Sequence, residues 1–389
     1  MPSYISFTIL ALKQESIPVK LPHAVFSAAL TLCASLLFSP AQAAGESIVV
    51  GHAIDLSGPN GSIGRDYVTG ITTYFDSVNV KGGVNGRKIQ YLVRDDRGDP
   101  VESARQASTL IKQDQPQYLL GAIGAEATQA ILAAPAFANS GHVLFAPLSQ
   151  THAEARTRVL FWRPSVEREF QFILAYFQKL GIKKIGVALQ NSPANQQTYL
   201  MVQNEIRRQA MTLSGTALIS ANVDADAKQI SAAGAKVVLL IADTFASAQF
   251  LKAYRKHEPH TFVAGTSLIN LATLSEIAGA RATDWTVFSQ VVPNPGSTAS
   301  SLQTEHIDMM RKFRDEPVSS VTLEGFAVAK TLVKLMQMEG GGRASMQRLA
   351  ATRTTIDLGG MTLISAEKKG ALSNFVDIAL FKRDGGLKY

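Results

Sequence analysis

Five short polar loops carry the residues that could bind a small molecule. Each loop follows an apolar run typical of a buried strand, and the loops begin near residues 55, 121, 147, 242 and 265. A polar residue in any one of them would be interpreted as a helix cap. Because ligands of open α/β sheets bind at the carboxyl ends of strands, five such loops together predict one pocket. The candidate contacts are Ser57, Ala125, Glu126, Thr128, Ser149, Gln150, Asp243, Thr244 and Thr266.

The first two loops favour different chemistries. Residues 55–64 are rich in glycine and serine, which indicates either close backbone approach to a ligand or a flexible connection. A phosphate loop is a further alternative, but G-K-[ST] and G-x-G-x-x-G are both missing. Residues 121–128 lead into a helix, where backbone N–H groups bind anions such as a carboxylate. Glu126 either stabilises that helix start through the dipole or pairs with a cationic group of the ligand.

Enzyme chemistry has little support in the sequence. None of the seven histidines forms an H-E-x-x-H pattern, and there is no G-x-S-x-G segment. The single cysteine, Cys33, lies in an N-terminal segment that we expect to be removed. The sequence therefore predicts a non-enzymatic protein without a metal site or cofactor.

The N-terminus has the features of a secretory signal peptide. Lys20 and His23 precede an apolar stretch from Ala24 to Phe38, and Ala41-Gln42-Ala43 forms an A-x-A cleavage site. A stable membrane-spanning helix needs about 20 apolar residues, more than this stretch offers. We expect a signal peptide over residues 1–43, cleavage near Ala43 and a periplasmic protein. A buried core helix is the other interpretation.

The rest of the chain alternates apolar strand runs with amphipathic helices. The run Val237–Ile241 is apolar throughout, as strands covered on both faces are. Asp99 and Pro100 predict a helix start, with Glu102 completing a capping box. The alternation predicts parallel sheets covered by helices, and 389 residues favour two domains. One helix is expected over residues 126–140, and strands are expected over 355–365 and 374–382.

Charge does not favour a nucleic-acid partner. The formal net charge is +7, but the lysines and arginines are scattered and form no basic run interleaved with aromatic residues. We interpret this charge as a solvated surface.

Taken together, the motifs resemble the branched-chain amino acid (Leu/Ile/Val-type) solute-binding proteins of ABC transporters, which have the type I periplasmic-binding fold. The likeness runs from Ile48 to Leu387, and its specificity comes from the order and spacing of many short segments. These segments are Ser57-Gly58-Pro59 with Gly64 and Gly70, residues 81–87, Arg94-Asp95-Asp96 through Pro100, 121–128, Pro147, 180–185, 324–326, 358–360, Gly370 and 384–385.

The resemblance implies an α/β clamp of the Venus-flytrap kind, with two doubly wound parallel-sheet lobes joined by three crossovers and closing over a ligand. Lobe 1 is expected in residues 44–163 with 291–352, and lobe 2 in residues 164–290 with 353–389. In the family, a ligand carboxylate is held at positions that match Ala125–Thr128 and Leu148–Gln150 here. Asn191, Asp243 and Thr266 are expected to complete the site from lobe 2.

One departure from the family bears on the ligand. The family commonly holds the ligand's ammonium with an acidic residue where this sequence has Thr266, and aromatic residues that lie over the ligand match Ala194 and Asp243. Either Asp243 or Glu126 supplies the missing charge, because an uncompensated buried ammonium is costly. Otherwise the ligand is an amide, a urea or an aromatic carboxylate rather than a simple α-amino acid.

The function that these features favour is transport. We expect a monomer that captures a small polar organic ligand, an amino acid or a related amide or carboxylate, for an ABC permease at the inner membrane. The alternative is a periplasmic sensor that presents the same clamp to a membrane receptor or kinase. An exported enzyme is a third possibility, for which the sequence offers no nucleophile–base pair.

Overall fold

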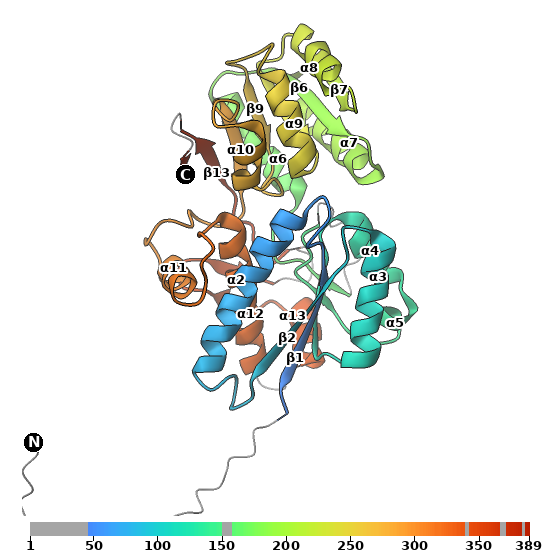
Figure 1. Ribbon diagram of the computed structural model, residues 1–389, viewed down its shortest axis with the longest axis vertical. Coiled ribbons are helices and arrows are strands. Elements are labelled where there is room, and N and C mark those ends of the chain that lie inside the picture. The colour runs from blue at the N-terminus through green and yellow to red at the C-terminus, as the bar shows by residue number, and fades with distance from the viewer. Residues whose placement is uncertain (1–45, 150–157, 339–341, 366–370, 383–385) are drawn as a thin grey trace, which may run out of the picture. The chain divides into compact units, whose positions relative to one another are not determined.

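The computed structural model describes residues 46–149, 158–338, 342–365, 371–382 and 386–389. This part of the chain forms two α/β lobes, each built on one large sheet (Figure 1). None of the helices in these ranges is long and apolar enough to cross a membrane. The expected signal peptide, with Cys33, lies outside the described residues.

The first lobe contains a sheet of five strands in the order β2-β1-β3-β4-β5, and all neighbours are parallel. The strands are β1 (Ile48–Ile54), β2 (Ile89–Asp95), β3 (Tyr118–Leu120), β4 (Leu144–Phe145) and β5 (Val159–Leu160). The helices are α2 (Gly61–Val80), α3 (Pro100–Thr109), η1 (Leu110–Asp114), α4 (Ala125–Ala133), α5 (Pro135–Ala138), α11 (Ser301–Phe313), α12 (Ser320–Gln337) and α13 (Arg343–Ala351).

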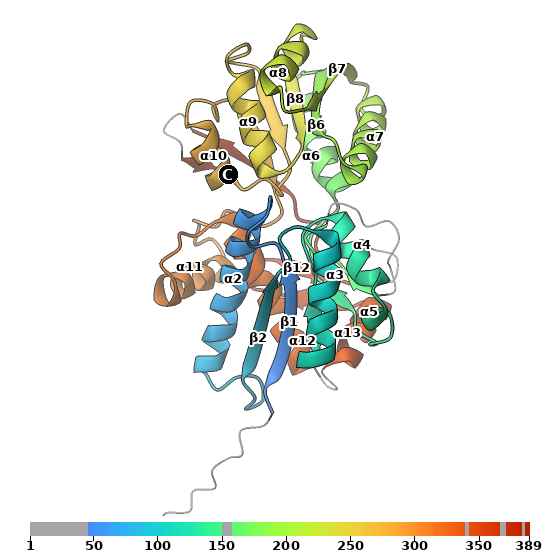
Figure 2. The same ribbon diagram turned by 45° about the vertical axis from the view of Figure 1, so that its right-hand side comes forward.

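Side chains of the first sheet pack into two separate apolar cores, one on each face. Val50 and Ile54 of β1 lie in a core with residues of α2 and α12, whereas Ala53 lies in a core with residues of α3, α4 and α5. Figure 2 shows these helices on the two sides of the sheet. Successive residues of a strand face opposite sides of the sheet, so a strand covered on both faces must be apolar throughout. The prediction of parallel strands covered by helices is confirmed for this lobe.

The second lobe contains a sheet of seven strands in the order β14-β13-β10-β9-β8-β6-β7. The strands are β6 (Lys184–Gln190), β7 (Thr212–Ile219), β8 (Val237–Ile241), β9 (Phe262–Gly265), β10 (Thr286–Gln290), β13 (Asp377–Phe381) and β14 (Leu387–Lys388). The helices are α6 (Val166–Lys179), α7 (Pro193–Arg208), α8 (Val223–Ala232), α9 (Thr244–Tyr254) and α10 (Leu271–Ala278). Two further cores cover the two faces of this sheet.

The second sheet differs from the prediction at its C-terminal edge. Its strands are parallel from β10 to β7, but β13 is antiparallel to β10 and β14 is antiparallel to β13. The cause is the direction of the chain, because β10 leads out of this lobe and β13 leads back into it. Strands that run in opposite directions can pair without a crossover helix between them.

The chain passes between the lobes three times, after β5, after β10 and before β13. One segment lies in the lobe opposite to the one predicted. Strands β11 (Thr355–Asp357) and β12 (Thr362–Ile364) form a hairpin whose Ile356 and Leu363 are buried in the core with α2 and α12. The prediction that lobe 2 begins again at residue 353 is therefore wrong for this hairpin. The hairpin also replaces the single strand predicted over 355–365, because Gly359 and Gly360 turn the chain at φ 87° and 116°.

Local signals at two helix starts explain where the prediction succeeds and where it fails. The Asp99 side chain accepts a hydrogen bond from the Glu102 N–H at 2.9 Å, as an N-cap should. The Glu102 side chain does not complete a capping box, since it binds Arg105 instead. The single helix predicted over 126–140 is divided into α4 and α5 at Pro135, which cannot donate an intrahelical hydrogen bond.

Two glycines allow α2 and α12 to lie against each other. A Cβ atom on Gly70 would overlap the carbonyl oxygen of Thr322, and one on Gly325 would overlap that of Tyr67. The backbones of these two helices of the first lobe are therefore in direct contact.

Candidate ligand-binding site

Loops at the carboxyl ends of strands in both sheets meet where the two lobes face each other (Figure 2). Glu126, in the first turn of α4, accepts a hydrogen bond with its Oε1 from the Ala194 N–H at the start of α7, at 3.2 Å. Asp66 on α2 accepts one with its Oδ2 from Nδ2 of Asn270, the N-cap of α10, at 3.1 Å. Both bonds join a residue of the first lobe to one of the second.

The start of α4 is open to an anion. Its N-cap residue is Gly124, at φ 94°, which has no side chain to cap this helix end. The first N–H groups of a helix have no acceptor within the helix, and they carry the positive end of its dipole. The N–H groups of residues 125–127 are thus arranged as the sequence predicts for a carboxylate or carbonyl oxygen.

The neighbouring first-lobe candidates are less free to bind a ligand. Thr128 is buried, and its hydroxyl donates to the Gly124 carbonyl at 2.8 Å within the helix. Leu148, predicted as a contact, has its side chain in the core, and its N–H donates to the Ala122 carbonyl at 3.0 Å. Its carbonyl accepts the Gly124 N–H at 2.8 Å. Leu148 therefore positions the start of α4, and its contact with a ligand stays a prediction.

The last two first-lobe candidates follow Leu148 directly. Ser149 is buried, with 2% of its surface exposed. Gln150 lies outside the described residues.

The carboxylates of Asp55 and Asp95 accept hydrogen bonds from the glycine-rich loop, residues 55–64. Asp55 accepts the Gly58 N–H at 2.6 Å, and Asp95 accepts the Ser57 hydroxyl at 2.6 Å. Burial would raise the pKa of Asp95, but the hydrogen bonds to its carboxylate outweigh burial and lower that pKa. Carboxylates thus occupy donors that a phosphate would need, so the structure contradicts the phosphate-loop alternative. The exposed Ser57 already has an acceptor in Asp95.

The second-lobe candidates line the ends of β8 and β9. Asp243 is the N-cap of α9, where its Oδ1 accepts the Ala246 N–H at 2.8 Å. Thr244 is buried, and its Oγ1 accepts the Asn270 N–H at 2.9 Å. Thr266 is also buried, with 5% of its surface exposed.

Asn191 completes the second-lobe set at the end of β6. It is exposed, and its Oδ1 accepts a hydrogen bond from Gln196 Nε2 at 3.4 Å. Its backbone leads directly into α7, whose Ala194 N–H binds Glu126.

Both acids considered as substitutes for the family's amine-binding acid contact helix ends. Asp243 caps its own helix, and Glu126 contacts the start of α7 while lying in the first turn of α4. A carboxylate is stabilised at a helix start by N–H groups and by the dipole. Glu126 therefore lies where its structural role predicts, and its pairing with a cationic group of the ligand stays a prediction.

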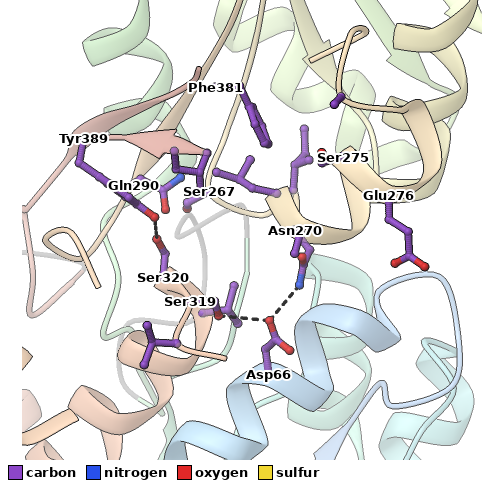
Figure 3. A pocket seen from close by; sticks show the side chains of 17 residues that line it. Asp66, Ser267, Asn270, Ser275, Glu276, Gln290, Ser319, Ser320, Phe381 and Tyr389 are labelled. Atoms are coloured by element: carbon purple, nitrogen blue, oxygen red, sulfur yellow. Dashed lines mark hydrogen bonds between the residues drawn. The ribbon is translucent and has the colours of Figure 1, made fainter. Parts of the chain in front are cut away.

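A pocket that the sequence predictions did not include lies on the same interface (Figure 3). Its volume is about 490 Å³, within the range of small-molecule sites. One of its lining residues is the acid Asp66, whose carboxylate accepts hydrogen bonds from Asn270 and Ser319. A lone acid on an amphipathic helix is normally a solvated residue, so nothing in the sequence singles out Asp66.

A buried ion cluster joins the lobes where the chain first crosses between them. Arg163 Nε lies 3.5 Å from Oε1 of Glu324 on α12, and Arg163 Nη2 lies 4.0 Å from Oε1 of Glu169 on α6. Glu169 also accepts the Ser267 N–H at 2.8 Å and the Ser289 hydroxyl at 2.6 Å. Burial raises the pKa of Glu324 to about 7, although Arg163 opposes this shift. In the described ranges, no group of three His, Cys, Asp or Glu residues is arranged to hold a metal ion.

The fold and the interface define a two-lobed α/β binding protein. The model of the periplasmic binding protein family matches residues 47–379. The chain therefore belongs to the periplasmic binding protein family, whose members are binding proteins.

Curated relatives match over a shorter region. BasB of Halobacterium salinarum, a substrate-binding protein of a chemotactic signal transduction system, is 31% identical over 90 residues, 23% of this chain and 22% of that protein. The Leu/Ile/Val-binding protein BraC3 of Rhizobium johnstonii is 32% identical over 93 residues, 24% of each chain. The chain thus matches about a quarter of these relatives' length.

Solved structures match over most of the chain. A substrate-binding periplasmic protein from Ralstonia solanacearum has a TM-score of 0.81 and 23% identity, and the match covers 88% of this chain and 99% of that one. This likeness shows the fold, which is that of type I periplasmic binding proteins. The resemblance to Leu/Ile/Val-type binding proteins is confirmed.

Proposed function

We propose that this protein captures a small polar organic solute between its lobes and delivers it to an ABC permease at the inner membrane. The observation that carries the proposal is the uncapped start of α4, which faces the start of α7 across the interface between the lobes. Proteins of this architecture close around ligands by hinge motion. The protein acts as a periplasmic monomer, with its signal peptide cleaved near Ala43, and performs no chemistry on the solute.

In the proposed complex, the N–H groups at the start of α4 bind an oxygen of the ligand. The second lobe closes over the ligand with polar groups at the ends of three strands. The proposed contacts are Ser57, Ala125, Glu126, Thr128, Ser149 and Gln150 on the first lobe, with Asn191, Asp243, Thr244 and Thr266 on the second.

The charges at the site favour certain ligands within the proposed class, which is an amino acid or a related amide or carboxylate. Glu126 lies beside the N–H groups of α4, so a ligand carboxylate there would be repelled by it. An amide, a urea or an ammonium offers N–H donors that the Glu126 carboxylate can accept. Thr266 provides no charge for an ammonium, which leaves Glu126 as the anionic partner closest to the α4 start.

Uptake by living cells tests the transport step. Cells that lack the gene should lose uptake of the labelled solute that the purified protein binds, and a plasmid copy should restore it. Uptake that continues at the wild-type rate without the gene would contradict delivery to a permease.

A sensor is the second candidate function, and the similarity to BasB favours it specifically. Under this alternative the same clamp reports its ligand to a membrane receptor or kinase. Cells that lack the gene would then keep normal uptake but lose their swimming or transcriptional response to the solute.

A further inference from the structure

The pocket at the interface is built from both lobes and is distinct from the proposed cleft. Asp66, Ser319 and Val321 come from α2 and α12 of the first lobe, while Asn270 and Phe381 come from the second (Figure 3). Among the described residues, none of the proposed cleft contacts lines it. The pocket therefore offers a second place for a ligand.

The walls of this pocket are largely apolar and include the aromatic rings of Phe381 and Tyr389. Phe381 and Tyr389 are only partly exposed, and the Tyr389 hydroxyl lies 3.1 Å from that of Ser320. Burial of an apolar ligand surface against such walls is favourable. The apolar wall residues are Ile269, Leu271, Val318, Val321, Phe381 and Leu387.

Asp66 gives the pocket a carboxyl group that, among the described residues, has no cationic partner in an ion pair. Its Oδ2 accepts hydrogen bonds from Asn270 Nδ2 at 3.1 Å and from the Ser319 hydroxyl at 3.2 Å, and both donors are neutral. Within the described part of the chain, no lysine, arginine or histidine forms an ion pair with Asp66. Burial raises the pKa of this carboxyl. The two hydrogen bonds and the nearby charge of Arg65 oppose that shift, and Glu316 adds to it.

Arg65 lowers the pKa of Asp66 from a distance, but it forms no ion pair with this carboxylate and leaves room for a cation beside it. Arg65 is exposed on the same helix, and its Nη1 donates to the Leu56 carbonyl at 2.5 Å. Glu276 is an exposed acid in the pocket wall, so it adds negative charge. A partly buried carboxylate without a cationic partner is stabilised when a cation enters beside it.

We propose that this pocket is a second binding site, which takes a small organic ammonium with an apolar substituent. Asp66 accepts the ammonium, and the walls around Phe381 and Leu271 cover the substituent. An inorganic cation fits less well, because it needs several oxygen ligands in place of its water shell. An anionic ligand is repelled by both Asp66 and Glu276.

Calorimetric titration with phenethylamine tests this proposal, with 2-phenylethanol as the neutral analogue of the same shape. We expect saturable binding of one phenethylamine per chain at neutral pH and at least tenfold weaker binding of the alcohol. Asp66→Asn should weaken phenethylamine at least tenfold. Asp308→Asn removes an exposed acid of α11 that does not line the pocket, and this variant should bind phenethylamine within twofold of the wild-type protein.

A second variant keeps the test decisive if Asp66→Asn folds poorly. Val318 lies on the pocket wall and is 36% exposed, so an arginine there has room to reach Asp66 without disturbing a core. Val318→Arg should lower phenethylamine affinity at least tenfold while circular dichroism stays unchanged. The proposal is overturned if the wild-type protein shows no saturable phenethylamine binding, or if folded variants at both positions bind as tightly as the wild type.

Discussion

The carboxylate of Glu126 on the first lobe accepts a hydrogen bond from the backbone N–H of Ala194 on the second, at 3.2 Å. The same carboxylate lies in the first turn of its own helix, α4. One acid therefore lies at the positive ends of two helices that belong to different lobes, in the middle of the proposed cleft.

This double contact predicts the stability of Glu126→Gln. Removing the charge should lower the free energy of unfolding by about 1 kcal/mol, because a carboxylate near one helix start contributes about 0.3–1 kcal/mol. Glu167→Gln is the matched control, since Glu167 is an exposed first-turn acid of α6 alone. In urea titrations, a loss for Glu126→Gln no larger than for Glu167→Gln would show that the contact with α7 is not stabilising.

Thr266→Glu should create affinity for aliphatic amino acids. The position matches the family's amine-binding acid, and a carboxylate there would pair with the ligand's ammonium. We expect isoleucine to bind at least tenfold more tightly to this variant than to the wild-type protein by calorimetry. Thr266→Gln has the same size without the charge and should bring no gain. Equal isoleucine affinity for the two variants would mean that Thr266 does not face the ligand.

Gly325→Ala should destabilise the first lobe by about 1–3 kcal/mol or more, since overpacking a close contact has this magnitude. The added methyl group would overlap the Tyr67 carbonyl oxygen on α2, and both sides of this contact are backbone. Gly296→Ala is the control, because a Cβ there would meet only the Asn294 Oδ1 at an ordinary 3.5 Å. Thermal unfolding that shows similar midpoints for the two variants would contradict the close packing of α2 on α12.

Glu324 should make stability depend on pH. Burial raises its pKa from 4.5 to about 7 in the folded protein, with Arg163 opposing the shift and Glu169 adding to it. The folded state thus holds the proton more tightly than the unfolded state. The stability that the protonated Glu324 contributes is fully present below pH 4.5 and is lost as the pH rises to about 7. This contribution is on the order of 3 kcal/mol. Tyr67, the other titratable group that interacts with Glu324, has its pKa raised well above 10 and stays neutral in this range.

The variant Glu324→Gln isolates this effect from other titrating groups. His52 and His306 act in the opposite direction, because burial lowers the pKa of each to about 4 and their contribution is lost as the pH falls below 6.5. These histidines are common to both proteins, so they cancel in the difference between variant and wild type. Relative to the wild type, the variant should gain stability between pH 4.5 and 7 and then stay level. A difference that does not change with pH would contradict ionisation of Glu324 in the folded protein.

Sequence patterns predicted the elements whose causes are local. Apolar runs such as Val237–Ile241 mark strands covered on both faces, and Asp99 with Pro100 marks a helix start. The loops at strand ends follow from these elements, because parallel strands place their carboxyl ends at one edge.

Sequence patterns did not predict features that depend on residues far apart in the chain. The residues of β11 and β12 are typical of strands and would be so in either lobe. The lobe to which this hairpin belongs is decided by the packing of Ile356 and Leu363. The partners of Glu126 and Asp66 lie 68 and 204 residues away. The resemblance to the family predicts Leu148 as a ligand contact, whereas its backbone bonds to Ala122 and Gly124 depend on residues more than 20 positions away.

Thermal unfolding of the protein with amino acids, amides, ureas and aromatic carboxylates tests the central claim most directly. The Asp66→Asn variant should be measured in parallel, so that binding in the second pocket is not counted. A ligand of the folded state at a hundredfold excess over its dissociation constant adds roughly 2.7 kcal/mol of stability. The account predicts a clear rise in melting temperature, in both proteins, with at least one compound. If no compound of these four classes raises the melting temperature of either protein, the proposed capture of a small polar solute is contradicted.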